Sequence, residues 1–157
     1  MESESREDYY TLSLPPCKGL APPSPEPVTV ESLRPIREHV EQFARYFLRE
    51  RGKGSLQFEA AETLESLGYV KYEAHLFNDG YRYIGACCFR WREWENAPAS
   101  WSLDWAWFHP YFRSRGHLTR AWPSFTARYG DFHLARPLSH AMEAFLAKVA
   151  SLRGPAQ

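Results

Sequence analysis

The segment FHPYFRSRGHLTRAW, residues 108–122, says more about the fold than any other part of the chain. A run of aromatic and apolar residues ends at Pro110, two arginines and a glycine follow, and a helix is expected to begin near His117. The first amides of a helix have no partner within the helix and carry the positive end of its dipole. A glycine lets backbone approach an anion closely, and arginines add charge-assisted hydrogen bonds. The segment is therefore either a diphosphate-binding loop or a basic surface turn.

The residues before this segment predict helices first. Over residues 29–51 apolar side chains recur at three- and four-residue spacing, and Gly52 is expected to end that helix. Ser32 is the expected N-cap, and Pro35 suits a first turn. A second, shorter helix is predicted over residues 56–68.

After residue 68 the residue pattern changes from one typical of helices to one typical of strands. Residues 69–77 and 81–94 are rich in aromatic and β-branched side chains, and the Asn-Asp-Gly sequence between them predicts a hairpin turn. A third strand is predicted over residues 101–110. After the Arg/Gly segment we expect a helix, a short strand and a last helix, at residues 118–130, 131–135 and 137–154. This order predicts the α+β class, with a mixed, mostly antiparallel central sheet flanked by helices.

The 157-residue chain divides into two parts by composition. Six of the 12 prolines lie in residues 1–27, which favours an extended arm, disordered or lying on the surface. Residues 28–157 are predicted to form a single domain, long enough to bury a core.

Composition argues against several classes of protein: nucleic-acid-binding, disulfide-rich, metal-binding, secreted and membrane-spanning. Lys+Arg and Asp+Glu both number 19, so a domain-wide basic surface for nucleic acid is absent. The three cysteines and six histidines show no spacing typical of a disulfide framework or a metal site. The acidic, polar start is unlike a signal peptide, and no apolar run is long enough for a membrane span. We expect a cytoplasmic protein with no metal and no membrane partner.

The Arg/Gly segment resembles the acetyl-CoA-binding segment of GNAT-type N-acetyltransferases. That family shows a strand ending in V-x-P, then Q/R-x-x-G-x-G/A, then a helix. Residues 108–110 match the strand end and residues 113–117 the first five loop positions, while Leu118 stands where the family prefers Gly or Ala. The element order agrees over residues 29–150, although the specific part is about ten residues.

The resemblance implies an acetyl-CoA-dependent N-acetyltransferase that acts on an amine of a protein or small molecule. In the family the strand before the loop binds the pantetheine arm through its backbone, and a strand amide polarises the thioester carbonyl. The residues implied to bind acetyl-CoA are Trp107, Phe108, Arg113, Ser114, Arg115, Gly116, His117, Leu118 and Thr119.

The candidate general base is Asp104, the only acid in residues 101–110. Side chains alternate along a strand, so Asp104 is expected to share a face with Ser102 and to lie opposite Trp105. Desolvation among aromatic rings disfavours the charged carboxylate, which suits a base. The alternative is a buried aspartate that bonds to backbone or an indole. The family's usual acidic position falls near Ser102.

The family's usual general acid is a tyrosine in the last helix, where this chain has Phe145 and Leu146. Tyr129, His140 or a water is then the candidate acid, unless the thiolate leaves unaided. The alternative function is a catalytically inactive GNAT-like module that binds acyl-CoA or another protein. The acceptor and homodimer formation stay open, although the acidic loop at residues 93–95 favours a cationic amine.

Overall fold

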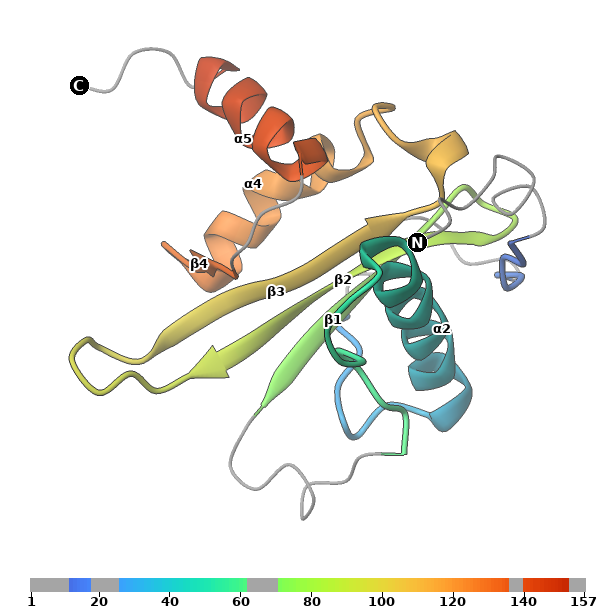
Figure 1. Cartoon of the computed structure of the whole chain (residues 1–157), viewed down its shortest axis with the longest axis horizontal. Coiled ribbons are helices and arrows are strands. Elements are labelled where there is room, and N and C mark those ends of the chain that lie inside the picture. The colour runs from blue at the N-terminus through green and yellow to red at the C-terminus, as the bar shows by residue number, and fades with distance from the viewer. Residues whose placement is uncertain (1–11, 18–25, 62–70, 136–139, 153–157) are drawn as a thin grey trace.

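A computed structural model describes residues 12–17, 26–61, 71–135 and 140–152 of the chain (Figure 1). In these residues a four-stranded sheet of order β1-β2-β3-β4 carries helices on both faces. The predicted α+β class is confirmed. No helix in the described ranges is both long and apolar enough to cross a membrane.

The sheet is mixed and mostly antiparallel, as predicted. β1 (Tyr72–Asn78), β2 (Tyr83–Arg92) and β3 (Ser100–Phe108) pair in antiparallel order. The short β4 (His133–Leu134) then joins the outer side of β3 in the parallel direction. A parallel neighbour requires a crossover, and the segment 109–132 provides it.

The helix α2 (Arg34–Arg51) covers one face of the sheet. Pro35 stands in its first turn as predicted, and Gly52 ends it with φ of 77°. The prediction of Ser32 as N-cap is wrong, because the cap position falls on Leu33. Ser32 lies one residue before the cap position. Its hydroxyl accepts a hydrogen bond from the Thr29 amide at 2.8 Å instead of from an amide of the helix.

Helices α4 (His117–Tyr129) and α5 (His140–Leu152) cover the opposite face. They pack together through Trp122 and Phe145, whose ring centroids lie 5.0 Å apart. Of the helix predicted over residues 56–68, residues 56–61 are not helical and the rest falls outside the described residues.

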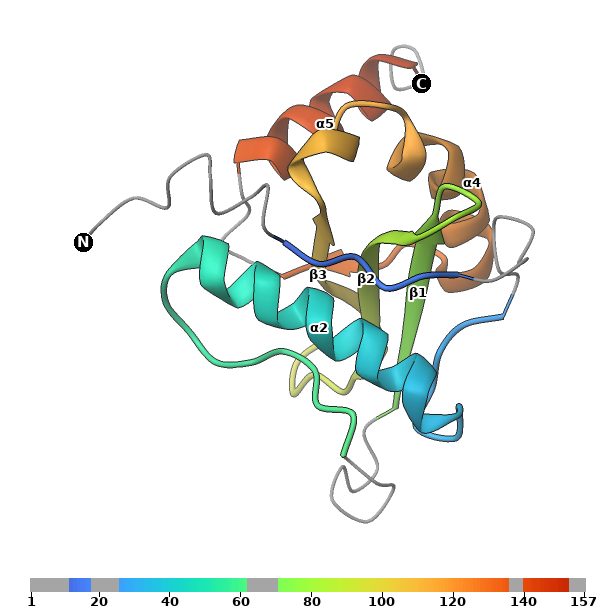
Figure 2. The same cartoon turned by 90° about the vertical axis from the view of Figure 1, so that its right-hand side faces the viewer.

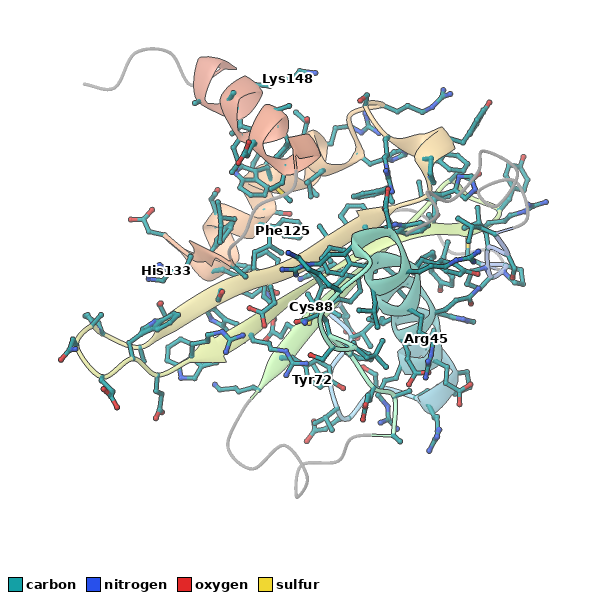
Figure 3. The ribbon with its side chains drawn as sticks, viewed as in Figure 1. Arg45, Tyr72, Cys88, Phe125, His133 and Lys148 are labelled. Carbon is teal, nitrogen blue, oxygen red and sulfur yellow. The ribbon has the colours of Figure 1, made fainter. Side chains whose placement is uncertain are left out.

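The two faces carry separate cores. Cys88 belongs to the core under α2, where Phe43 stacks on Trp107 at 5.8 Å. Cys87 and Phe125 belong to the core under α4, so the adjacent cysteines pack on opposite faces of the sheet. Cys88 and Phe125 are labelled in Figure 3. Burial raises the pKa of the Cys87 thiol, which leaves it a poor nucleophile.

Residues 12–17, within the predicted arm of residues 1–27, pack against the domain. The Cys17 amide donates to the Tyr81 carbonyl at 3.0 Å, and the Tyr83 amide donates to the Pro15 carbonyl at 2.8 Å. The Cys17 side chain lies in the core. Residues 1–11 and 18–25 of the predicted arm lie outside the described residues.

Candidate functional site

A pocket of about 890 Å³ lies along the outer edge of β3. Its wall comes from the C-terminal end of α2, from β3, from the loop before α4 with the first turn of that helix, and from α5. Figure 2 shows the end of α2 and the start of α5 on the same side of the molecule, next to β3. The volume is typical of a ligand-binding site.

The pocket exists because β3 and β4 part soon after they meet. β4 pairs with β3 only at Ser102 and Leu103, and Leu134 is its last residue. Residues 104–108 of β3 continue beyond this point (Figure 1), and their outer edge has no strand partner within the described ranges. An open strand edge presents unpaired backbone groups.

The backbone groups of β3 can be assigned to the two sides. The His109 amide donates to the Ile84 carbonyl of β2 at 2.9 Å, so its N–H faces inward, toward β2. The Phe108 carbonyl accepts from Arg113 Nε at 2.8 Å and faces outward. Because these groups alternate along a strand, Ala106 also turns its backbone groups outward. The pocket is thus lined by main-chain donors and acceptors of β3.

A bulge interrupts β3 at Asp104. Cys88 of β2 pairs with Trp105, but the next residue, Phe89, pairs with Leu103, so Asp104 is an extra residue. A bulge bends the strand and leaves one residue unpaired. It lies where β3 leaves β4, at the inner end of the open edge.

The bulge changes which residues share a face. Trp105 lies in the core under α2, with its ring 6.0 Å from that of Phe47. Asp104 contacts Arg90, whose guanidinium lies over the Tyr72 ring of the same core. The prediction that Asp104 and Trp105 occupy opposite faces is therefore wrong, because alternation assumed a regular strand.

The Asp104 side chain is held as an ion-pair partner. Its Oδ2 lies 2.7 Å from Arg92 Nη2 and 3.4 Å from Arg90 Nε, while Oδ1 has no hydrogen-bond partner in the described part of the chain. The side chain is only 2% exposed, although the residue as a whole is half-buried. What Asp104 exposes to the pocket is therefore mainly its backbone.

The other two predicted catalytic residues do not line the pocket. Ser102 is buried, 2% exposed, on the inner part of β3. The Tyr129 hydroxyl donates to Glu73 Oε1 at 2.9 Å and lies 2.6 Å from His75 Nε2. Burial first, and then Glu73, raise the pKa of Tyr129, which opposes a role as an acid. Arg128 completes this network at 2.7 Å from Glu73.

Most of the predicted cofactor-binding residues do line the pocket. They are Trp107, Phe108, Arg113, Ser114, Gly116, His117, Leu118 and Thr119. Arg115 is the exception, because it folds back on Tyr111: its Nε donates to the Tyr111 carbonyl at 2.7 Å and its guanidinium lies 4.4 Å from the ring centroid.

Helix α4 begins at His117, directly after Gly116, as the sequence predicted. Gly116 precedes the helix in the left-handed region with φ of 83°, and Ser114 has φ of 60°. Gly116 is therefore needed for its conformation. The amides of His117 to Thr119 belong to the first turn, which carries the positive end of the helix dipole, and these residues line the pocket.

His117 adds a neutral ring at this end. The ring stacks on Phe108, with centroids 6.1 Å apart, and Nδ1 lies 3.3 Å from Arg120 Nη2. Burial, followed by the charges of Arg120 and Arg115, lowers the pKa of His117. A neutral imidazole beside a helix N-terminus can donate one hydrogen bond to an anion.

Glu50 is a site residue that the sequence reasoning missed. Both carboxylate oxygens accept from Arg113, at 2.7 and 2.6 Å, and Oε2 also accepts from Trp107 Nε1 at 2.7 Å. Arg113 is thus bound to protein groups, although the sequence predicted it as a phosphate ligand. One signal was available: an acid in the last turn of a helix opposes the dipole, which indicates a partner outside the helix.

Comparison of the sequence with protein-family models and with curated proteins finds no match. In the part of the chain that the structure describes, no three His, Cys, Asp or Glu side chains are grouped so that they could hold a metal ion.

Proposed function

We propose that the chain is an acetyl-CoA-dependent N-acetyltransferase of the GNAT type that acts on an amine. One observation carries the proposal: the unpaired edge of β3 and the first turn of α4 meet in a single pocket. A strand edge suits the amides of a pantetheine arm, and a helix N-terminus suits a diphosphate. The sequence likeness of residues 108–117 to the GNAT loop supports the same assignment.

The cofactor fits the pocket in one direction. The diphosphate takes the amides of residues 116–119, with His117 as a further donor. The pantetheine arm follows the outward backbone groups of Phe108 and Ala106. The thioester then lies near the bulge at Asp104, where main-chain groups are exposed and can polarise its carbonyl.

The reaction needs little from side chains. The amine nitrogen bonds to the thioester carbonyl carbon, the carbon–sulfur bond breaks, and the thiolate takes up a proton while the nitrogen loses one. Holding the two reactants together supplies much of the rate. Since both carboxylates of the described lining residues, Glu50 and Asp104, are in ion pairs, we assign the proton transfers to solvent and give Asp104 the role of holding the bulge.

The same ion pairs favour a second candidate, a module that binds acyl-CoA without turnover. Tyr129 and Ser102 lie away from the pocket, and Glu50 and Asp104 are held by arginines. Under this second candidate function the protein binds acyl-CoA at the same site and does not transfer the acyl group.

Thiol release from acetyl-CoA separates the two candidates. The assay is run with a panel of amines and with an acceptor-free control that measures hydrolysis. Release that depends on an amine, with a matching N-acetyl product by mass spectrometry, supports the enzyme. Saturable acetyl-CoA binding with no amine-dependent release over the panel supports the binding module, and absence of binding rejects both.

A further inference from the structure

The pocket extends past the edge of β3 to the face that α2 covers. Six of the described lining residues lie there. Phe47, Arg51, Lys53 and Trp105 are the ones we call the α2 lobe, and Glu50 and Trp107 lie beside them. The loop and helix assigned to the cofactor lie on the other face, with α4 and α5. An acceptor that enters through the α2 lobe therefore reaches the β3 bulge from the side opposite the helices α4 and α5.

The α2 lobe has an aromatic wall. The rings of Phe47 and Trp105 are 6.0 Å apart. Trp105 is almost fully buried, so the half-buried Phe47 supplies most of the wall that a ligand can contact. The Arg51 guanidinium lies 6.0 Å from the Phe47 centroid, so a cation borders this wall. Such a surface fits an apolar or aromatic side chain with a negative charge beside it.

The charge of the lobe is positive. Arg51 and Lys53 are exposed, and neither forms an ion pair with another described residue. The two carboxylates among the described lining residues are neutralised, Glu50 by Arg113 at 2.6 Å and Asp104 by Arg92 at 2.7 Å. A cationic acceptor meets no uncompensated carboxylate among the described lining residues, whereas an anionic group meets two cations.

The acidic loop does not change this balance. Glu95 lines a separate pocket with Trp94 and His133, at the far end of the β2–β3 hairpin. Neither Glu93 nor Glu95 lines the pocket on β3. The loop that favoured a cationic amine in the sequence therefore has no place at the acceptor lobe.

We propose that the acceptor is a primary amine that carries a carboxylate close to its nitrogen, with an apolar side chain. This inference rests on the proposed acyl-transfer function and names its substrate class. The amine points toward the bulge of β3, the side chain lies against Phe47 and Trp105, and the carboxylate pairs with Arg51 and Lys53. A free amino acid and the amino terminus of an acidic peptide both present this chemistry.

Calorimetry on the CoA-loaded protein tests the proposal without requiring turnover. The probes are phenylalanine, phenylalaninamide and phenethylamine, which share the ring and the amine and differ in the carboxylate. Two peptides, Phe-Glu-Glu-Gly-amide and Phe-Gln-Gln-Gly-amide, separate a free amino acid from a peptide terminus. We expect phenylalanine or the acidic peptide to bind about tenfold more tightly than the matched probe that lacks a carboxylate, with the difference shrinking at high salt.

Variants assign the effect to the lobe. The double substitution Arg51→Gln with Lys53→Gln should remove the preference for the carboxylate and leave CoA affinity unchanged. Arg45→Gln removes an exposed arginine of the same helix, outside the pocket, and should change neither.

Two results overturn the inference while CoA binding stands. One is equal or tighter binding of the amines that lack a carboxylate. The other is a loss of CoA affinity in the double variant with unchanged amine preference, which assigns the two cations to the cofactor phosphates. Absence of CoA binding rejects the proposed function itself, and the inference falls with it.

Discussion

Glu50 and Arg113 form a two-point ion pair, with N···O distances of 2.7 and 2.6 Å, that joins the end of α2 to the loop before α4. Glu50 Oε2 also binds the Trp107 indole, so one carboxylate holds three parts of the pocket wall. The side chains of Arg113 and Glu50 are 33% and 30% exposed, and water therefore screens part of the attraction.

A double-mutant cycle measures this clamp. We expect Glu50→Gln and Arg113→Gln each to lower the free energy of unfolding, with a coupling energy of about 1 kcal/mol between them. Urea denaturation of the four proteins gives the coupling. Strictly additive effects on the free energy of unfolding would show that the contact between Glu50 and Arg113 does not stabilise the protein.

Gly116 should be required for cofactor binding beyond its effect on stability. Alanine at φ of 83° costs about 1 kcal/mol, and its Cβ would lie 2.7 Å from Arg120 Nη1, the flexible end of a side chain. We expect Gly116→Ala to weaken acetyl-CoA binding about tenfold, because the backbone that orients the first amides of α4 shifts.

Gly130 provides the matched control at the opposite end of the same helix. It has φ of 66°, a Cβ added there would meet no atom within 4 Å, and the residue does not line the pocket. Because its ψ is −145°, a conformation that residues other than glycine rarely adopt, Gly130→Ala should lower stability at least as much as Gly116→Ala and leave acetyl-CoA affinity unchanged. Equal losses of affinity in the two variants would mean that backbone strain lowers the affinity, and that the position of the first amides of α4 does not.

The stability of the domain should fall as the pH is lowered from about 6.5 to about 4. Burial lowers the pKa of His75 to about 4 from an ordinary value of 6.5. In this window the unfolded chain takes up a proton at residue 75 and the folded chain does not, so unfolding is favoured. The loss reaches about 3 kcal/mol once the pH is below the folded pKa.

The variant His75→Gln isolates this contribution. Glutamine does not titrate, and its amide can still donate to the Tyr129 hydroxyl. Denaturation at pH 7.5 and pH 4.5 should show a smaller loss of stability in the variant than in the parent protein. An equal loss in both proteins would place the proton uptake on other groups.

Asp104 should act through the bulge and not through proton transfer. Asp104→Asn keeps the shape but leaves Arg92 and Arg90 without their carboxylate, which should cost about 3 kcal/mol of stability. In the proposed mechanism kcat falls by less than about tenfold and the pH profile keeps its form. A fall of about 100-fold or more, with one limb of the profile lost, would make Asp104 the general base.

Local pattern in the sequence predicts the parts of the fold that depend on neighbouring residues. The helix before Gly52, the hairpin around the Asn-Asp-Gly turn, and the strand, loop and helix around Gly116 follow from periodicity and turn chemistry, and the structure has them. The predicted faces of β3 are wrong from Trp105 onward, because the one-residue bulge at Asp104 leaves no mark in the alternation of side chains.

Contacts between distant residues could not be predicted in the same way. Glu50 and Arg113 are 63 residues apart, and their pairing depends on how α2 crosses the sheet. The pairing of Asp104 with Arg90 and Arg92 depends on the register of β2 on β3. Tyr129 is a candidate acid in the sequence, but its position on α4 turns it toward Glu73 and away from the pocket.

The proposed function depends above all on the edge of β3 and the start of α4 forming one acyl-CoA site. Calorimetric titration of acetyl-CoA into the purified protein measures this binding without an acceptor. We expect saturable binding to one site per chain, weakened by Gly116→Ala and unaffected by Gly130→Ala. A folded protein that shows no acetyl-CoA binding at millimolar ligand would mean that no such site exists.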